Sequence, residues 1–255
     1  MKTLKFEANE REEWLYTRRG KITGSTLKDI AVSSGVTKEM IVDWLVANNI
    51  PFIKTAKKED LEKLVSPEGM AKLKMAAPKK IGFYDLIAAK LGLPPDDENP
   101  MARGSRLEKE AIARFEEENP GIKVDTSLII WTRDENESIA ISPDGIIDVE
   151  SAIEAKCLSS ARHIEAFLTK KIPAEYELQA LQYFIVNDEL ETLHFIFYDP
   201  RFLMFSDPDG KQAKIDYFEI TVTRAEVQDQ IDEMLEYERK VIAEVNAVVN
   251  KLSNF

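Results

Sequence analysis

The sequence predicts a protein of the mixed α/β class, with a central mixed β-sheet flanked by helices and a helical N-terminal elaboration. Three observations predict this class. Helical periodicity fills most of residues 10–118, short β-rich segments follow between 127 and 157, and a long amphipathic pattern covers the last thirty residues. The chain has 255 residues, 44% of them hydrophobic, and no Pro-, Gly- or Ser-rich linker. We therefore expect a single domain over residues 1–255.

The N-terminal part is expected to be helical. A helix is predicted through Glu10 to Arg18 with a break at Gly20, and a second helix is expected to open at Ser25, a residue type that caps helix N-termini. Residues 37–92 carry apolar side chains at helical spacing. The breaks expected within this stretch are Pro51, Ser66-Pro67 and Pro78. We expect residues of about 35–95 to form a Lys-rich helical elaboration.

The elements of the core are expected between residues of about 100 and 222. After a loop over Leu93–Pro100, helices are predicted at Met101–Glu118, Ala161–Thr169 and Ala174–Val186. The predicted strands are Ser127–Thr132, Ser138–Ile141, Ile146–Val149, Ala152–Cys157, Leu193–Tyr198 and Ile215–Val222.

A C-terminal helix is predicted over residues 223–253, with its amphipathic part at Arg224–Leu252. Its apolar positions are Val227, Ile231, Leu235, Ile242, Val245 and Val248. Such a face fits core packing and subunit contact equally well, and the sequence does not choose between them.

Composition excludes several classes of protein. No run of 18 apolar residues is present, and the N-terminus is charged without an apolar segment, so neither a membrane span nor a secretory signal is predicted. A cytoplasmic location is expected. The single cysteine, Cys157, cannot form an internal disulfide, and with only His163 and His194 it cannot build a usual zinc site. Any bound metal is therefore expected to have oxygen ligands.

Charge is distributed unevenly along the chain. The net charge of −12 argues against nucleic-acid binding, since Lys and Arg normally neutralise phosphates. However, residues 1–80 carry 16 Lys and Arg against 11 Asp and Glu, while the remaining residues carry 18 against 35. Lys-rich stretches are commonly solvated helix faces, so this asymmetry alone is weak support for a binding surface.

Two short motifs carry the chemistry. Ser142-Pro143-Asp144-Gly145 is followed by Glu154-Ala155-Lys156, and a hairpin-like arrangement can bring Asp144 and Glu154 to the same end of the sheet. In an extended strand Glu154 and Lys156 share one face and Ala155 points to the other. Paired carboxylates suit Mg²⁺, and a lysine beside them can position water or stabilise a charged transition state. The pattern predicts a centre that hydrolyses phosphodiesters.

A structural interpretation competes with this one. Asp144-Gly145 can be a plain hairpin turn, and Glu154 with Lys156 an exposed pair of side chains, because short motifs recur by accident. The predicted strand, turn and strand around the motif favour the functional interpretation.

With these motifs in place, the sequence resembles the phage lambda-type exonuclease, or YqaJ-like viral recombinase, family of PD-(D/E)XK nucleases. The resemblance covers nearly the whole chain and is poorest at Gly35–Pro95. The matching blocks are Trp14 with Arg18 to Ser25, Gly104 with Glu108, Ser142 to Gly145 with Glu154 to Cys157, and Tyr176 with Gln179 followed by Tyr198 to Arg201.

The resemblance implies a PD-(D/E)XK, restriction-endonuclease-like core and a processive 5′-to-3′ exonuclease that degrades one strand of linear double-stranded DNA. It implies a ring-shaped homotrimer, a phage or prophage origin, and a single-strand annealing protein as partner in recombination. Mg²⁺, with Mn²⁺ substituting and two ions expected, would be held by Asp144, Glu154, Glu108 and the Ala155 carbonyl. Lys156 would be the catalytic lysine, and Gln179 would arrange the site, although Gln182 lies one helical turn away and competes for that role.

The resemblance also implies a pocket for a terminal 5′-phosphate made by Arg18, Ser25 and Ser142. An arginine fork and two hydroxyls suit a phosphate dianion. Met101 falls where the family places an apolar wedge that parts the strands. The plainer interpretations are an exposed helical arginine, a simple N-cap at Ser25 and a packing role for Met101.

Three further expectations complete the sequence-based interpretation. His163, just after the motif strand, could contact DNA, while Cys157 is expected to face away from the site and pack. The Lys-rich stretch Lys54 to Lys80 is expected to line the DNA path. The alternative functions are a PD-(D/E)XK endonuclease or repair nuclease, and a non-catalytic DNA-end-binding recombination protein.

Overall fold

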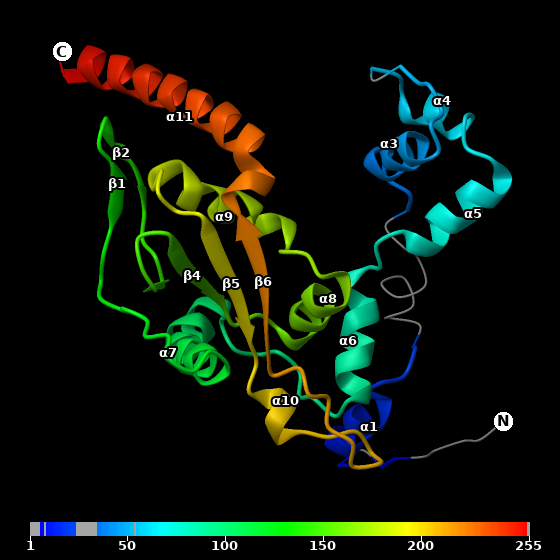
Figure 1. Ribbon diagram of the computed structural model, residues 1–255. Helices are drawn as coiled ribbons and strands as arrows, with labels where there is room; N and C mark the ends of the chain where they lie inside the picture. The colour runs from blue at the N-terminus through cyan, green and yellow to red at the C-terminus, as the bar shows by residue number, and fades with distance from the viewer. Residues whose placement is uncertain (1–5, 8, 24–34, 54, 254–255) are drawn as a thin grey trace. The chain divides into compact units, whose positions relative to one another are not determined.

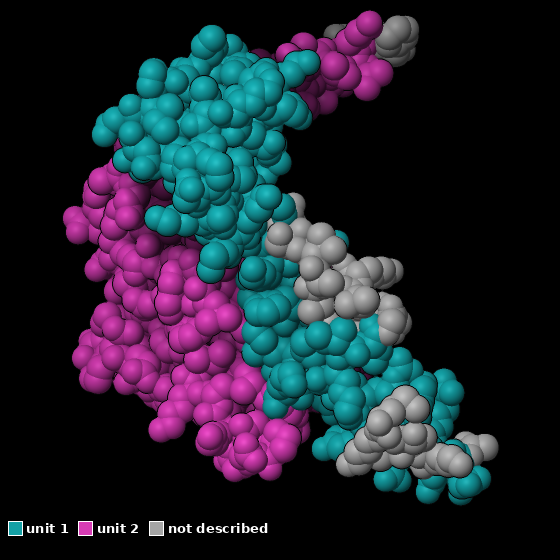
Figure 2. All heavy atoms as spheres, turned by 90° about the vertical axis from the view of Figure 1, so that its right-hand side faces the viewer, with its two compact units in different colours: residues 1–90 teal, residues 91–255 magenta. Residues whose placement is uncertain are grey.

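The computed structural model describes residues 6–7, 9–23, 35–53 and 55–253. They separate into two compact units, Met1–Lys90 and Leu91–Phe255, which Figure 2 colours teal and magenta. The expectation of a single domain stays a prediction, because compactness does not show whether the units fold independently. The helix expected to open at Ser25 lies outside the described residues.

The first unit is helical, as the spacing of its apolar residues predicts. Its helices are α1 (Arg11–Arg18), α3 (Lys38–Ala47), α4 (Lys58–Glu62), α5 (Pro67–Ala76) and α6 (Ile81–Lys90). The predicted breaks are confirmed. Pro51 follows the end of α3, Pro78 follows the end of α5, and α5 begins at Pro67 with the Ser66 side chain accepting a hydrogen bond from Gly69 N at 3.0 Å.

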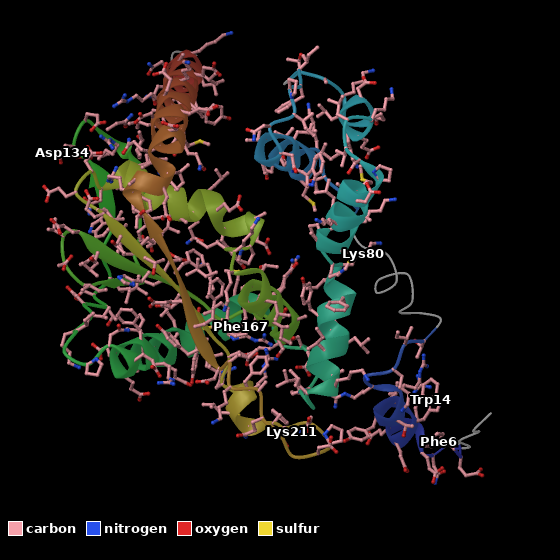
Figure 3. All side chains as sticks on the ribbon, turned by 45° about the vertical axis from the view of Figure 1, so that its right-hand side comes forward. Phe6, Trp14, Lys80, Asp134, Phe167 and Lys211 are labelled. Carbon is pink, nitrogen blue, oxygen red and sulfur yellow. The ribbon has the colours of Figure 1, made fainter. Side chains whose placement is uncertain are left out.

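The core of this unit is made by α3, α4 and α5. Its buried members are Val36, Ile41, Leu45, Leu61, Val65 and Leu73. Trp44 of α3 packs over Gly69, where an added Cβ would lie only 2.4 Å from the indole. On α1, Arg18 stacks over Trp14 with its guanidinium carbon 4.4 Å from the ring centroid. Figure 3 labels Trp14 on this helix.

The second unit holds a four-stranded mixed sheet in the order β3-β4-β5-β6. Its strands are β3 (Gly145–Ile146), β4 (Ser151–Lys156), β5 (Thr192–Tyr198) and β6 (Tyr217–Thr223). β4 and β5 are parallel, and the other neighbours are antiparallel. A parallel pair needs a crossover, which α8 (Ser160–Thr169) and α9 (Ala174–Val186) supply. A separate hairpin joins β1 (Trp131–Arg133) and β2 (Asn136–Ile141).

Helices cover both faces of this sheet (Figure 1). On one face, α7 (Pro100–Glu118) buries Leu107, Ala111 and Phe115 against Ile153 of β4 and Ile196 of β5. On the other face, α9 and α11 (Arg224–Ser253) pack over a cluster that includes Phe195 and Phe197. Phe167 of α8 meets Phe218 of β6 edge to face at 5.3 Å (Figure 3). The predicted mixed α/β class, with its sheet flanked by helices and its helical N-terminal part, is confirmed.

Some predicted elements are wrong in extent. The strand predicted at Ser127–Thr132 is confined to Trp131–Arg133, because Leu128 and Ile130 are exposed and have no neighbouring strand. The strand predicted at Ile146–Val149 ends at Ile146, where a bend begins in which Asp148 accepts a hydrogen bond from Glu150 N. A short helix, α10 (Arg201–Met204), was not predicted. Among the described residues no helix has the length and apolarity to cross a membrane.

Candidate active site

The hairpin of β3 and β4 brings the two motifs together. Gly145 pairs with Ile153 in the antiparallel ladder, so Asp144, just before β3, lies beside Glu154 and Ala155. Gly145 packs against Val124, because an added Cβ at this position would lie only 2.5 Å from Val124 Cγ1. Asp144 Oδ2 accepts a hydrogen bond from Ala155 N at 2.9 Å, which fixes the carboxylate against the edge of β4.

Three donors hold the Glu154 carboxylate. Gln179 Nε2 donates to its Oε1 at 2.7 Å, and Lys156 Nζ donates to the same oxygen. Tyr183 donates its hydroxyl to Oε2 at 2.5 Å. Gln179 and Tyr183 are one turn apart on α9, so this helix supplies two of the three donors. The side chain is 1% exposed, which excludes the interpretation of an exposed surface pair.

Burial and mutual repulsion act on the acidic groups. Burial, and then the charge of Asp144, raises the pKa of Glu154 from 4.5 to about 7. Burial also raises the pKa of Asp144. The pKa of Glu108 is raised by burial and by Asp144. We call Glu108, Asp144, Glu154 and Lys156 the carboxylate cluster.

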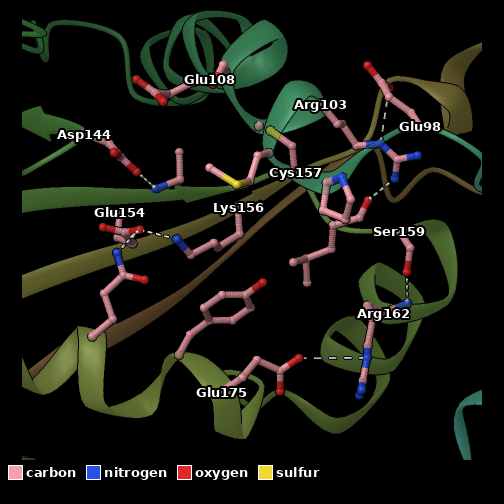
Figure 4. Close-up of a pocket in the computed structure, with 18 of the residues that line it drawn as sticks. Glu98, Arg103, Glu108, Asp144, Glu154, Lys156, Cys157, Ser159, Arg162 and Glu175 are labelled. Carbon is pink, nitrogen blue, oxygen red and sulfur yellow. Dashed lines mark hydrogen bonds and ion pairs between the residues drawn. The ribbon is translucent and has the colours of Figure 1, made fainter.

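The carboxylate cluster lines one pocket of the second unit, with a cavity volume of about 690 Å³ (Figure 4). Glu108 projects from the middle of α7, as predicted, while the other three residues come from the β3-β4 hairpin. Met101 lies at the rim on the first turn of α7 and is 83% exposed. Its assignment as a strand wedge stays a prediction.

The donor set fits a hard divalent cation. Asp144 and Glu154 present oxygen atoms in one buried, negatively charged recess, and Glu108 lines the same pocket. A positive charge there would oppose the repulsion from Asp144 that, after burial, raises the pKa values of Glu108 and Glu154. Within the described residues, no three His, Cys, Asp or Glu side chains already converge as a ready metal site. The fit therefore rests on the chemistry of the donors, and the metal-binding roles, including that of the Ala155 carbonyl, stay predictions.

Lys156 shares a face with Glu154, as strand alternation predicts, and its Nζ lies 4.8 Å from the centroid of the Tyr176 ring. Cys157 departs from the prediction. It packs among α7 residues, but it also lines the pocket, because β4 ends at Lys156 and no longer separates the two faces there. Burial raises the pKa of Cys157 to about 12, so its thiol stays protonated.

The expectation that His163 could contact DNA is wrong. His163 is fully buried, stacks on Phe202, and its Nε2 lies 2.5 Å from Ile215 O. Burial lowers the pKa of His163, so the imidazole is neutral. It is a packing residue of α8.

A second ionic group, which we call the guanidinium cluster, lies beside the pocket. Its members are Asp96, Arg103, Asp199 and Arg201. Arg103 Nη2 donates to Asp96 Oδ1 at 2.5 Å and its Nη1 to Leu158 O at 2.9 Å. Arg201 donates to both oxygens of Asp199 at 2.8 Å and also to Asp96. These bonds anchor the segment after β4, which leads into α8.

Some predicted site residues are not brought to the pocket. Ser142 is exposed in the turn before Pro143 and is not among the described residues that line the pocket. Arg18 lies in the first unit, and Ser25 lies outside the described residues. Lys54 is likewise undescribed, so the predicted DNA path over Lys54 to Lys80 stays a prediction.

Gln179, not Gln182, is the glutamine that contacts Glu154. Gln182 points to α11, where its Nε2 lies 3.5 Å from Glu238. Sequence reasoning missed Tyr183 and Arg103. The signal for Tyr183 was its spacing of four residues from Gln179, which places both on one face of a helix.

The fold and site define a class of protein: an α/β protein with buried carboxylates and a lysine at the end of a mixed sheet. The family model of the YqaJ-like viral recombinase domain matches residues 13–189. The chain belongs to this family, and the resemblance found in the sequence is confirmed. The match begins within α1, spans α7, the β3-β4 hairpin and the whole of α9, and ends at Glu189.

Solved structures with similarity to this chain carry exonuclease names. LHK-Exo in complex with dAMP is 23% identical, with 95% of this chain and 98% of the other covered and a TM-score of 0.48. The alkaline exonuclease LHK-Exo from Laribacter hongkongensis is 23% identical, with 94% of this chain and 99% of the other covered and a TM-score of 0.44. A phage related exonuclease from Haemophilus somnus 129PT is 18% identical, with 84% of this chain and 98% of the other covered and a TM-score of 0.38. All three TM-scores are below 0.5, so the family assignment depends on the family model. No curated protein sequence matches the chain.

Proposed function

We propose that this protein is a Mg²⁺-dependent deoxyribonuclease that degrades one strand of linear double-stranded DNA from 5′-phosphorylated ends, in the 5′-to-3′ direction, during phage-type recombination. The observation that carries the proposal is the carboxylate cluster, in which Asp144, Glu154 and Lys156 share one pocket. Membership of the YqaJ-like viral recombinase family supports it.

In the proposed reaction, water attacks the phosphorus between the first two nucleotides, the bond from phosphorus to the 3′ oxygen breaks, and a 5′-mononucleotide leaves. Asp144, Glu154 and Glu108 would hold Mg²⁺, with Mn²⁺ able to replace it, and the ion would supply charge neutralisation and activation of water. Lys156 Nζ would orient the attacking water and stabilise the charge that develops on the phosphate. Gln179 would keep the Glu154 carboxylate in position.

The decisive experiment uses Asp144→Ala and Lys156→Ala on 5′-phosphorylated linear duplex DNA in Mg²⁺. Each variant should lose ~10²–10³-fold in rate, the range found when a group that stabilises developing charge is removed. Asp209→Ala and Lys211→Ala are matched controls on an exposed turn of the same unit and should retain full activity. Undiminished digestion by Asp144→Ala or Lys156→Ala would refute the proposal.

Closed circular duplex DNA separates an exonuclease from an endonuclease on the same core. An end-dependent enzyme leaves the circle intact and degrades it after linearisation. Cutting of the circle would favour the endonuclease alternative. Binding of DNA ends without turnover in either Mg²⁺ or Mn²⁺ would favour the non-catalytic one.

The preference for 5′-phosphate is assigned to Arg18, Ser25 and Ser142 on the basis of the family resemblance. Arg18→Ala should bring the rates on 5′-phosphate and 5′-hydroxyl ends together, because a guanidinium fork suits a phosphate dianion. Arg11→Ala, on the same helix, is the matched control. An unchanged ratio in Arg18→Ala would move the phosphate pocket elsewhere.

We further propose a homotrimeric ring, a single-strand annealing protein as partner, and a cytoplasmic location in a bacterial host. The ring would explain processive degradation, and its mass in solution tests it. A monomer at assay concentrations would contradict the ring and would leave the chemistry of the carboxylate cluster unaffected.

A further inference from the structure

Helix α11 divides into two parts with different surroundings. Its first half packs on the second unit: Ile231 is buried, and Val227, Met234, Leu235 and Ile242 contact the core cluster that α9 also covers. Arg239 ties the middle of the helix to Glu135 in the β1-β2 turn, with 2.8 Å between Nη2 and Oε1. Ile242 is the last residue of the helix in that core.

The second half of α11 carries apolar side chains that the second unit does not cover. Val241, Val245, Val248 and Leu252 are 38%, 53%, 56% and 66% exposed. In Figure 1 this end of the helix, coloured red, extends beyond the sheet and α9. Valine is a weak helix former, so valines at these positions are not explained by helix propensity. They suit a buried contact.

The spacing of these four residues is that of a coiled coil. Steps of four, three and four residues place Val241 and Val248 at d positions and Val245 and Leu252 at a positions of a heptad. The same register extends back through Met234, Ile231 and Val227, with Glu238 at the a position between Met234 and Val241. The register that packs the helix on its own core therefore continues past the point where that core ends.

The charged residues beside these four apolar side chains indicate which partner fits them. Glu244 and Lys251 both occupy g positions, and among the described side chains neither forms an ion pair. In an antiparallel pair of helices, g positions face g positions. Pairing Val245 with Val248 of a second copy places Glu244 opposite Lys251 of that copy, and two-fold symmetry repeats the ion pair.

We propose that a second copy of this chain pairs with residues 241–252 of α11 in antiparallel orientation. Val241 then faces Leu252 of the second copy, and Val245 faces its Val248, which gives four apolar layers. A parallel pair would instead set Glu244 opposite Val249, with no ion pair, so the charges favour the antiparallel arrangement.

The pairing is expected to be weak. Twelve helical residues span only about 18 Å, and the contact buries less area than the roughly 1,200–2,000 Å² of a stable interface. The association is therefore concentration-dependent and doubles whichever assembly the chain otherwise forms. The inference is independent of the proposed nuclease activity, because no residue of the carboxylate cluster takes part.

Sedimentation velocity of the full chain from ~1 to ~100 µM tests the proposal by charge reversal. The wild type should double its mass as concentration rises. Glu244→Lys and Lys251→Glu should each weaken the doubling at least ~10-fold, since each places two like-charged contacts in the pair. The double variant should recover it to within ~3-fold, and so should an equimolar mixture of the two single variants. Ala243→Lys, on the outward face, is the control.

Three results would overturn the proposal: a mass that does not double in the wild type, single variants equal to the wild type, or a double variant no better than the single ones. Oxidative cross-linking gives a readout of direction. A mixture of Val245→Cys and Val248→Cys proteins should form a disulfide-linked pair, whereas Val245→Cys alone should not. Cys157, the one native cysteine, is buried and provides no background. Cross-linking of Val245→Cys alone would indicate parallel pairing and would also overturn it.

Discussion

The guanidinium cluster and the carboxylate cluster lie beside one another near the end of β4, and they differ in charge balance. In the guanidinium cluster two arginines meet two aspartates through hydrogen bonds. The carboxylate cluster has one lysine for three acidic residues. The charge of Asp144 contributes to the raised pKa values of the other two, Glu108 and Glu154. A buried charge must be paired or must change its protonation. The charges of the guanidinium cluster are balanced by its own side chains, and the acidic charges of the carboxylate cluster outnumber its one lysine.

The comparison separates a structural role from a functional one. Loss of a member of the guanidinium cluster should lower the free energy of unfolding, because its partners are left buried and unpaired. Loss of an acid from the carboxylate cluster should relieve repulsion and reduce activity. Three predictions test this contrast, all measured first as a change in the free energy of unfolding.

The largest effect is expected from Arg103→Ala. Arg103 is 5% exposed and holds Asp96 and the Leu158 carbonyl, so its removal should cost about 3–5 kcal/mol. Urea denaturation measures the loss. Arg106→Ala is the matched control on the same helix, because the Arg106 side chain is 56% exposed and its ion pair with Glu98 should contribute less than about 1 kcal/mol. If the two variants lose equal stability, the guanidinium cluster is not the structural element described here.

An intermediate effect is expected from pH. Because the pKa of Glu154 is raised to about 7 in the folded chain, against an ordinary value of 4.5, the folded state binds this proton more tightly than the unfolded state. The resulting stability is fully present below about pH 4.5 and is lost as the pH rises through about 7, by up to about 3 kcal/mol. Chemical denaturation in chelator between pH 5 and 8 should show the fall, and Mg²⁺ should reduce it.

Glu154→Gln should flatten this fall, because the variant has no proton to lose. Glu135→Gln is the control: the pKa of Glu135 is lowered to about 2, chiefly by Arg133, so its titration lies outside the measured range. If the free energy of unfolding falls with pH equally in Glu154→Gln and the wild type, the pH dependence belongs to another group.

The smallest effect is expected from Tyr183→Phe. The ring stays in the core and only the donor to Glu154 is lost, which should cost about 1–2 kcal/mol. If Tyr183 positions the carboxylate, the half-saturating Mg²⁺ concentration for activity should rise by about 10-fold. Tyr237→Phe, at an exposed position of α11, should change neither quantity. A stability loss without a shift in Mg²⁺ dependence would leave Tyr183 a purely structural residue.

Local patterns predicted much of the fold. The apolar spacing gave the bounds of α9 without error and those of α11 to within one residue, because both helices bury a regular face. The extent of β1 and β3 could not be predicted from side-chain alternation. A strand extends only as far as a neighbouring strand offers backbone N–H and C=O groups to pair with. Leu128 and Ile130 alternate as a strand would but have no partner.

The site was predictable where its members are close in sequence or belong to the family motif. Asp144, Glu154 and Lys156 were placed together from spacing alone, because a hairpin relates them. Arg103 and Tyr183 could not be found in this way. The Leu158 carbonyl is 55 residues from Arg103 and Glu154 is 29 residues from Tyr183, so only the packing of α7 and α9 on the sheet brings these groups into contact.

The three hydrogen bonds to Glu154 also have an entropic consequence. A free glutamate side chain samples many rotamers, and fixing one costs up to about 2 kcal/mol of conformational entropy. Here α9 and Lys156 fix it during folding, so a ligand that enters the pocket meets a carboxylate already ordered. Affinity at this position is then set by the contacts that the ligand makes, with little loss of side-chain freedom to offset them.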